Sequence, residues 1–238
     1  MKPIKNFPKL KYIGNWKIIR NRMKNYKDLN RGQWAELKLN EVSNKLPNKI
    51  VSDIGSGYGW FRPTVEKFNL QWQPFDYISK IEESTIWDLN NPAPENKKRP
   101  GFVVFMEVLE HLSNPELGIK NISNHIEKGG YMVLTTPNPL SAQSKFSLFF
   151  KNNLYAFQPK HLIEHHVYVP LPHVVKFHLE NNGFEILEVA TIGRLIAPKF
   201  TFGFNYIKGL VHYFFLQLLV VFIPESKGHT QTFFVVKK

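Results

Sequence analysis

The stretch Ile50-Val51-Ser52-Asp53-Ile54-Gly55-Ser56-Gly57-Tyr58-Gly59 decides the fold. Its first five residues are rich in β-branched side chains, which predicts a short buried strand. Glycines follow at alternate positions, and apolar residues then recur at helical spacing through Phe61, Val65 and Phe68. The order strand, glycine loop, helix predicts a nucleotide-binding unit, because glycines let the backbone approach a ligand closely and the loop aims amide N–H groups at it.

Strands and helices alternate on both sides of this unit. Helices are expected over 28–46, 115–126 and 170–182. The expected later strands are 70–77, 85–87, 101–106, 131–135, 184–192 and 230–236. Such alternation predicts an α/β fold with a doubly wound, mostly parallel sheet covered by helices on both faces, and ligands of such sheets bind at the carboxyl ends of the strands.

Length and composition limit how many domains and which kinds of site the chain can contain. With 238 residues and 43% hydrophobic content, it can bury the core of one large domain that carries an elaboration. The lack of cysteine excludes a disulfide scaffold, a thiolate metal site and a cysteine nucleophile. Since no apolar signal segment follows the basic start of the chain, a cytoplasmic location is expected.

The net charge of +12 is concentrated at the N-terminus. Residues 1–31 contain ten Lys or Arg against a single acid, Asp28, so this segment alone carries +9. We divide the chain accordingly into a basic N-terminal arm, 1–31, and a domain, 32–238. Such an arm suits a polyanionic neighbour, either nucleic acid or an anionic membrane face, although a solvated leader without specific contacts has the same composition.

An apolar insertion separates the last two expected strands. Residues 194–224 contain no acid, and 210–223 are apolar except at His212 and Gln217. This apolar run of 14 residues is shorter than the roughly 20 needed to span a bilayer, which argues against a transmembrane helix. We expect a hydrophobic hairpin or lid that contacts a membrane, packs on the protein or forms a dimer surface.

Two acids lie at the ends of expected strands. Asp76 follows the second strand and can accept hydrogen bonds from the vicinal hydroxyls of a ribose, in either a nicotinamide or an adenosyl cofactor. Asp88 follows the third strand and can either accept from an adenine amino group or cap a turn. The spacing Gly55-x-Gly57-x-Gly59 departs from the G-x-G-x-x-G that is usual in nicotinamide-binding loops.

Three motifs carry a resemblance to a known family. They are the glycine stretch from Asp53 to Gly59, the segment Met106-Glu107-Val108-Leu109-Glu110-His111-Leu112, and Gly129-Gly130 followed by Tyr131-Met132-Val133-Leu134-Thr135-Thr136-Pro137-Asn138. Together they resemble the class I S-adenosylmethionine-dependent methyltransferases, in particular the subgroup of ubiquinone-biosynthesis O-methyltransferases. The resemblance implies S-adenosyl-L-methionine as cofactor and a Rossmann-like sheet of seven mostly parallel strands, the last of them antiparallel.

The same resemblance implies a set of cofactor-binding residues in the glycine loop and at the ends of the next three strands. They are Asp53, Gly55, Ser56, Gly57, Gly59, Asp76, Tyr77, Asp88, Leu89, Met106 and Glu107. The sulfonium is already an activated methyl donor, so positioning of the acceptor dominates and contributes on the order of 7–11 kcal/mol. An oxygen acceptor must also lose a proton, either to a base or with the help of a metal.

Histidines are the candidates for that base. His111 follows the fourth strand and is expected to face the cleft, although it can instead orient a loop. Of the later histidines, His165 or His166 can close over the site from the loop after the fifth strand, whereas His173 and His178 are expected on a surface helix. The candidate catalytic residues are therefore His111, His165 and His166.

The segment with Glu107, Glu110 and His111, plus a later histidine, also resembles the metal ligands of small-RNA 3′-terminal 2′-O-methyltransferases. Quinone-type methyltransferases share this Glu-Val-Leu-Glu-His spelling, so it does not distinguish the two. We therefore assign no metal ligand, and we expect Glu110 to cap or pair within its helix.

Three functions are open. The leading one is O-methylation of a small or lipid-linked acceptor, such as a quinone precursor or a glycan intermediate, by a peripheral protein at the inner face of a membrane, because a basic arm accompanies an apolar insertion. The second is metal-dependent 2′-O-methylation of RNA, for which the chain lacks a clear stacking platform. The third is a non-catalytic cofactor-binding scaffold, and the presence of Asp76 and His111 argues against it.

Overall fold

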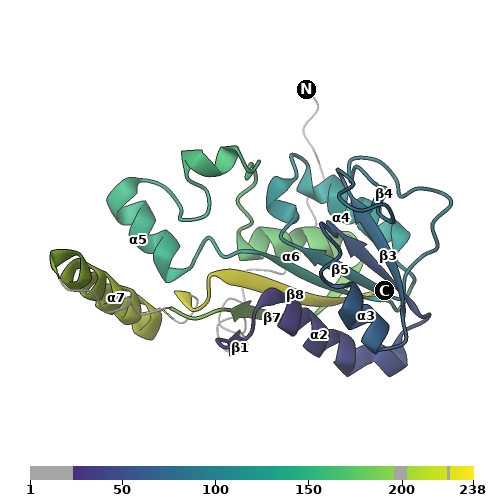
Figure 1. Ribbon diagram of the computed structural model, residues 1–238, viewed down its shortest axis with the longest axis horizontal. Coiled ribbons are helices and arrows are strands. Elements are labelled where there is room, and N and C mark those ends of the chain that lie inside the picture. Colours follow the sequence, from purple (N-terminus) through teal and green to yellow (C-terminus); the bar gives the residue numbers. More distant parts are fainter. Residues whose placement is uncertain (1–23, 196–202, 224–225) are drawn as a thin grey trace, which may run out of the picture.

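The computed structural model describes residues 24–195, 203–223 and 226–238. The strands are β1 Lys24–Tyr26, β2 Ile50–Ile54, β3 Gln71–Asp76, β4 Thr85–Ile86, β5 Phe102–Met106, β6 Tyr131–Pro137, β7 Phe184–Ile192 and β8 Thr230–Lys237. They form one sheet in the order β1-β7-β8-β6-β5-β2-β3-β4 (Figure 1). Neighbouring strands are parallel, except that β8 runs antiparallel to both β6 and β7.

The predicted α/β architecture is confirmed, but the sheet has eight strands and not seven. The additional strand is β1, which pairs in parallel with β7 so that Lys24 lies opposite Ala190 and Tyr26 opposite Ile192. These residues belong to the segment that the charge pattern assigned to the basic arm. The last part of that arm is therefore an edge of the sheet, while residues 1–23 lie outside the described residues.

Helices cover both faces of the sheet (Figure 1). The α-helices are α2 Arg31–Val42, α3 Arg62–Lys67, α4 Pro115–His125, α5 Ala142–Lys151, α6 Pro172–Asn181 and α7 Phe204–Phe222, and the short 3-10 helices are η1 Ser43–Lys45, η2 Leu109–His111 and η3 Pro159–Leu162. Asn30 begins α2 with a capping box, because its side chain accepts from the Gln33 amide while the Gln33 side chain accepts from the Asn30 amide.

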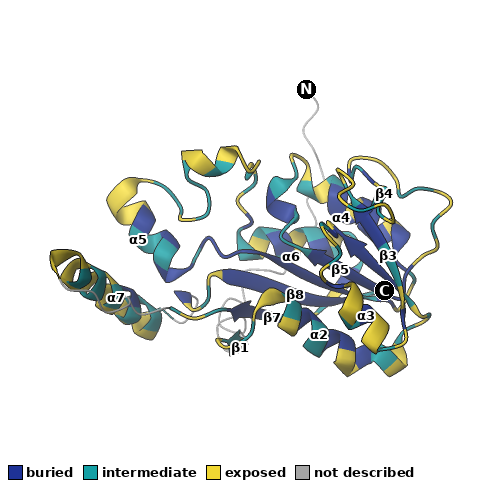
Figure 2. Cartoon of the chain, in the orientation of Figure 1, coloured by how far each residue is buried: buried dark blue, intermediate teal, exposed yellow. Residues whose placement is uncertain are grey.

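The core has one half on each face of the sheet, as the alternation of side chains along a strand requires. In β5, Val103 and Phe105 pack with α4 and α6, whereas Phe102 and Val104 pack with α2 and α3. Every one of these four side chains is fully buried. Figure 2 shows the same arrangement, with buried strands between helices whose outer faces are exposed.

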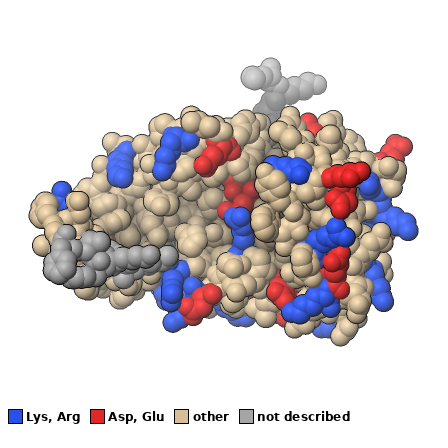
Figure 3. All heavy atoms as spheres, viewed as in Figure 1, with Lys and Arg blue, Asp and Glu red and all other residues tan. Residues whose placement is uncertain are grey.

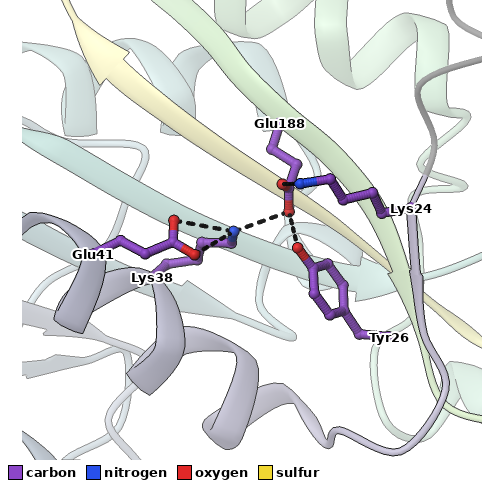
Figure 4. A network of polar contacts seen from close by, with 5 residues as sticks. All are labelled: Lys24, Tyr26, Lys38, Glu41 and Glu188. Carbon is purple, nitrogen blue, oxygen red and sulfur yellow. Dashed lines mark hydrogen bonds and ion pairs between the residues drawn. The ribbon is translucent and has the colours of Figure 1, made fainter.

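A buried ionic network fastens β1 and α2 to β7 (Figure 4). The Lys38 ammonium, on α2, lies 3.1 Å from a carboxylate oxygen of Glu188 and 3.1 Å from one of Glu41. Lys24 and the Tyr26 hydroxyl, both on β1, donate to Glu188 at 2.8 and 3.0 Å. Burial alone would raise the pKa of Glu188, but the hydrogen bonds from Lys24 and Lys38 outweigh it and lower that pKa.

The described part of the apolar insertion is one continuous helix, α7, and the expected hairpin is not found there. This helix is 19 residues long, so the argument from a run of 14 residues underestimated it. It is the one described helix whose length and composition would suffice to cross a membrane, and the same test is passed by some helices of soluble cores. Unlike a core helix, α7 buries only Leu216.

Candidate active site

The glycine loop leaves β2 at the carboxyl edge of the sheet, as predicted, and its conformation explains two of its glycines. Gly55 has φ 78°, and a Cβ added there would lie 2.3 Å from Cγ2 of Val108. Gly57 has φ 55° and nothing within 4 Å of an added Cβ, so its outer side is open. Both positions favour glycine through their left-handed backbone, and the open side at Gly57 leaves room for a ligand close to the chain.

The amides of this loop are used within the protein, which corrects the expectation that they point at a ligand. The Gly55 and Ser56 amides donate to the Phe75 carbonyl at 2.9 and 3.0 Å. The Gly57 amide donates to Asp76 Oδ2 at 2.8 Å, and the Gly59 amide donates to the Ser56 carbonyl at 2.9 Å. The loop therefore lets a ligand approach the backbone closely, but these four amide N–H groups already have acceptors within the protein.

Asp76 lies at the carboxyl end of β3 and beside the open glycine loop, as predicted for an acceptor of ribose hydroxyls. Its Oδ2 accepts from Gly57, its Oδ1 accepts weakly from the Ile78 amide at 3.4 Å, and the side chain is partly exposed. Each carboxylate oxygen can accept more than one hydrogen bond, so both remain available to vicinal hydroxyls. Tyr77, the next residue, is exposed beside it.

Asp53 and Ser56 are buried, so neither carries a freely exposed polar group. The Asp53 carboxylate accepts from Trp72 Nε1 at 3.1 Å, and burial raises its pKa to about 6. The Ser56 hydroxyl lies 3.4 Å from that of Ser84. We conclude that these two residues support the glycine loop from within the protein.

Asp88 and Leu89 both make contacts within the protein, and their predicted role in binding the cofactor stays a prediction. Asp88 Oδ1 accepts from the backbone and side-chain nitrogens of Asn90, both at 2.9 Å, so the carboxylate caps a turn, as the alternative interpretation had it. Leu89 is buried in the core between β4 and α4, where its Cβ lies 3.6 Å from the position of a Cβ added to Gly118.

A cavity of about 490 Å³ opens beside the glycine loop. Its lining includes Arg31 at the start of α2, Trp60 just after the loop and Met106 at the end of β5. Ile192 and Thr230, where β7 ends and β8 begins, line the other side. Of the residues predicted to bind the cofactor, Met106 is the one in this lining.

Glu107 lies between Arg31, which lines this cavity, and Thr135 of β6. Its backbone is left-handed, with φ 54°, and its carboxylate accepts from the Thr135 hydroxyl at 2.8 Å. The Arg31 guanidinium lies 3.9 Å from the other carboxylate oxygen. Burial raises the pKa of Glu107, although the Thr135 hydrogen bond and the Arg31 charge act in the opposite direction.

Glu110, His111 and His166 form a compact polar cluster one turn further on. One ligand-type atom from each side chain lies within 4.8 Å of the other two, and the rings of His111 and His166 meet edge to face with centroids 4.8 Å apart. Glu110 is 1% exposed and accepts from the Thr136 hydroxyl at 2.9 Å. The cluster thus joins η2, the end of β6 and the loop before α6.

Backbone hydrogen bonds explain why His166 reaches this cluster. The Glu110 carbonyl accepts from the amides of Val167 and Tyr168 at 3.0 and 3.1 Å, which ties the later loop to η2. His166 Nδ1 lies 2.8 Å from the Ala156 carbonyl, and since a carbonyl only accepts, Nδ1 carries the proton. In the neutral ring, Nε2 is then the basic nitrogen.

Electrostatics give the members of the cluster different protonation states. Burial raises the pKa of Glu110 to about 8, and the neighbouring Glu107 charge adds to this effect. Burial and His166 both lower the pKa of His111. At neutral pH the carboxyl therefore carries its proton while the His111 ring is neutral and can accept one.

The third predicted catalytic histidine, His165, is not part of the cluster. It is exposed, and its φ of 59° places it in the left-handed region at the tip of the loop. Its neighbour His166 turns inward because the two residues after it bond to Glu110. His173 is exposed on α6, as expected, whereas His178 is partly buried and lies 4.0 Å from Glu116.

Sequence reasoning missed several polar residues of the site. Thr135 and Thr136, the last polar residues of β6, hold Glu107 and Glu110, and both threonines are fully buried. Their signal was available, because two hydroxyls at the carboxyl end of an otherwise apolar strand face the ligand edge of such a sheet. Arg31, from a segment interpreted as a charged arm, gave no such signal.

Comparison with solved structures identifies the fold. A SAM-dependent methyltransferase from Archaeoglobus fulgidus is similar over 87% of this chain and 94% of its own, with a TM-score of 0.56 and 16% identity. An S-adenosylmethionine-dependent methyltransferase from Clostridium acetobutylicum is similar over 88% and 93%, with a TM-score of 0.55 and 11% identity. Both neighbours show that the chain has the fold of the S-adenosylmethionine-dependent methyltransferases, with its glycine loop at the carboxyl edge of the sheet.

The sequence comparison agrees. A family of methyltransferase domains matches residues 26–189, and the chain belongs to this family. The ubiquinone biosynthesis O-methyltransferase of Rickettsia prowazekii is 22% identical over 164 residues, which are 64% of this chain and 65% of that relative. The chain therefore contains a methyltransferase domain of the S-adenosylmethionine-dependent class, and it spans somewhat less than two thirds of the length of that relative.

Proposed function

We propose that the protein methylates a hydroxyl oxygen of a small or lipid-linked acceptor, such as a quinone precursor or a glycan intermediate, at a membrane face. The observation that carries the proposal is the pairing of His111 with His166 beside the buried Glu110 at the carboxyl end of β5. A base in this position suits an oxygen acceptor, which must give up a proton as it takes the methyl group.

The protonation states support this chemistry. The neutral His111 ring can take the proton of the acceptor hydroxyl. The Nδ1–H of His166 donates to the Ala156 carbonyl, and this bond holds the His166 ring edge to face against the His111 ring. S-adenosyl-L-methionine supplies the activated methyl group, and Asp76 with the open side of Gly57 is the part of this chain that suits its ribose. The remaining work is alignment of the acceptor.

Both the lining of the cavity and the name of the relative support a small or lipid-linked acceptor. The cavity beside the loop has apolar walls from Trp60, Met106 and Ile192, with Arg31 as its cation, which suits an aromatic or isoprenoid molecule carrying an acidic group. The curated relative is named as an enzyme of ubiquinone biosynthesis, whose product is a lipid. The insertion that leaves the sheet at this cavity contains α7, which is apolar and exposed.

The test compares histidine variants with a matched neighbour. His111→Gln and His166→Gln should each lower kcat for methylation of a dihydroxylated phenol by about 100-fold or more, the contribution of a positioned base. Both should leave the affinity for S-adenosylmethionine unchanged. His165→Asn, which suits the left-handed backbone one residue away, is the control and should keep kcat. Equal kcat in all three variants would remove the base from the proposal.

A second candidate is metal-assisted methylation of an RNA 2′-hydroxyl. The observation in its favour is that Glu110, His111 and His166 bring one oxygen and two nitrogens within 4.8 Å of one another. A divalent cation held there would acidify a hydroxyl, and it would have to displace the proton that Glu110 holds at neutral pH. Activity on RNA that is lost with a chelator and restored by Mn²⁺ would favour this candidate over the first.

A further inference from the structure

One side of α7 is an exposed apolar stripe. At about 100° per residue, its members cover roughly 120° of the circumference of the helix. They are Phe204, Ile207, Val211, Phe214, Phe215, Leu218, Val221 and Phe222, with exposed fractions from 39% to 77%. The opposite side carries the buried Leu216, so the stripe points away from the protein.

Helix α5 extends this stripe. Phe146 lies against Phe215 and His212 of α7, with ring centroids 5.5 and 4.2 Å apart. The neighbouring Phe149 and Phe150 are 78% and 56% exposed. We call the exposed apolar side chains of the two helices the α5–α7 surface. It is a continuous aromatic surface that no described part of the chain covers.

The charges on these helices have one sign. Lys151 and Lys208 are exposed on α5 and α7, the partly buried Lys145 of α5 donates to the Ser226 hydroxyl, and neither helix contains an acid. In Figure 3 the acidic side chains gather away from the end of the molecule that these helices form. A second copy of the chain would bring like charges to the same face, whereas an anionic membrane surface would complement them.

We propose that the α5–α7 surface docks the protein on an anionic lipid bilayer, with α7 lying in the plane of the interface. The apolar stripe enters the boundary between headgroups and acyl chains, and the lysines meet the anionic headgroups. This deepens the proposed function, because it names the surface through which a lipid-linked acceptor would be reached. It does not depend on the atom that is methylated.

The sheet excludes a spanning orientation for α7. Ile192 and Thr230 are paired across β7 and β8, so the insertion leaves and returns at the same point. If α7 crossed the bilayer, either 193–203 or 223–229 would have to cross back. As a helix, the longer of these would span only about 16 Å of a hydrocarbon core that is about 30 Å thick. In an extended form, either would leave backbone groups without hydrogen bonds in the hydrocarbon.

The insertion that carries α7 leaves the sheet and returns to it at the cavity. Ile192 precedes the insertion, His229 and Thr230 follow it, and all three line the cavity beside the glycine loop. A membrane held by α7 would therefore lie close to the mouth of that cavity. An acceptor anchored by an apolar tail could enter the cavity with its head while its tail stayed in the bilayer.

Vesicle flotation of the full chain tests the docking. Vesicles of equal parts phosphatidylcholine and phosphatidylglycerol should bind the protein, and phosphatidylcholine alone should bind it on the order of tenfold more weakly. Phe214→Glu should weaken binding to the mixed vesicles by about tenfold or more, because one exposed phenylalanine no longer enters the apolar boundary. The matched control is Gln217→Glu, which adds the same charge to α7 outside the stripe and should lose clearly less binding than Phe214→Glu, because only the shared electrostatic part is lost.

A depth measurement tests the orientation. Because the chain has no cysteine, Phe204→Cys, Phe214→Cys and Phe222→Cys each give a single site for a fluorescent label. Nitroxide lipids with the quencher close to the headgroup should quench all three labels to a similar extent. Deep quenching of the label at 214 together with shallow quenching at 204 and 222 would mean a spanning helix and overturn the in-plane proposal.

The outcomes separate this proposal from the proposed function. Absence of binding to both vesicle types would overturn the docking. So would a dimer in sedimentation velocity that Phe214→Glu converts to monomer without changing vesicle binding, because the surface would then belong to a second copy. If the parent chain binds vesicles but methylates no hydroxyl acceptor, the docking stands and the proposed function fails.

Discussion

At the scale of single residues, Asp76 is the predicted acceptor for the ribose of the cofactor. Its carboxylate holds the Gly57 amide and is partly exposed at the end of β3. Asp76→Ala should weaken binding of S-adenosylmethionine by about 10- to 100-fold, because hydrogen bonds to a charged group are worth about 1.5–3 kcal/mol each. Isothermal titration measures this. Asp88→Ala is the comparison: its carboxylate already accepts from Asn90, so this variant should lose less affinity than Asp76→Ala, and the reverse order would make Asp88 the main acceptor for the cofactor.

Glu110 gives the protein a pH-dependent stability. Burial raises its pKa in the folded state to about 8, from an ordinary value of 4.5. Between these two values the folded state binds more protons than the unfolded state, so the free energy of unfolding contributed by this residue falls as the pH rises. Glu110→Gln removes the titration and keeps an acceptor for Thr136.

In thermal denaturation with chelator present, Glu110→Gln should therefore gain stability relative to the parent as the pH rises from about 5 to about 8. The glutamine side chain still accepts from the Thr136 hydroxyl, so the comparison is not disturbed by a lost hydrogen bond. Parallel pH profiles of the two proteins would show that Glu110 is ionised in the folded protein across this range.

The choice between His165 and His166 shows the limit of sequence reasoning at this scale. The sequence placed both in the loop after the fifth strand, and nothing in their chemistry distinguishes them. The distinction comes from Val167 and Tyr168, whose amides bond to the Glu110 carbonyl far away in the chain. Such tertiary backbone bonds leave no local pattern, whereas the positions of Asp76 and His111 were predictable because Asp76 ends a strand and His111 follows one at the ligand edge.

At the scale of elements, the network around Glu188 fixes β1 and α2 against β7. Glu188→Ala should lower the free energy of unfolding by about 1–3 kcal/mol, because the buried Lys38 ammonium loses its partner on the sheet and keeps only the more exposed Glu41. Chemical denaturation measures the loss. Glu185→Ala, on the same strand but paired at the surface with Lys238, should cost less than about 1 kcal/mol. Equal losses would mean that the network adds nothing beyond an exposed ion pair.

Elements with a strong local pattern were predictable, and others were not. β2 and β7 have the predicted bounds, because each is a run of β-branched and apolar residues ended by glycine. β1 has no such pattern, since Lys-Asn-Tyr forms a strand only through its pairing with β7. The first turns of α7 escaped prediction because Asn205 and Lys208 interrupt the apolar run without interrupting the helix.

At the scale of the whole molecule, docking and catalysis should be coupled only for acceptors that reside in a membrane. Anionic vesicles should raise kcat/KM for a phenolic acceptor with a long isoprenoid tail, and added salt should reverse the gain as it screens the lysines. A tail-free phenol, assayed in parallel, should be methylated at the same rate with and without vesicles. An equal response of both acceptors to the vesicles would mean that the membrane acts on the enzyme and not on acceptor delivery.

The antiparallel pairing of β8 with β7 makes the apolar insertion a removable cassette. Because Ile192 and Thr230 already face each other, a tight turn of two residues would close the same hairpin without shifting its register. Evolution could therefore lengthen, shorten or exchange this cassette while the glycine loop and the histidine cluster, which belong to other strands, kept their geometry. Chains of this family could in this way share one catalytic frame and differ in the cellular surface on which they work.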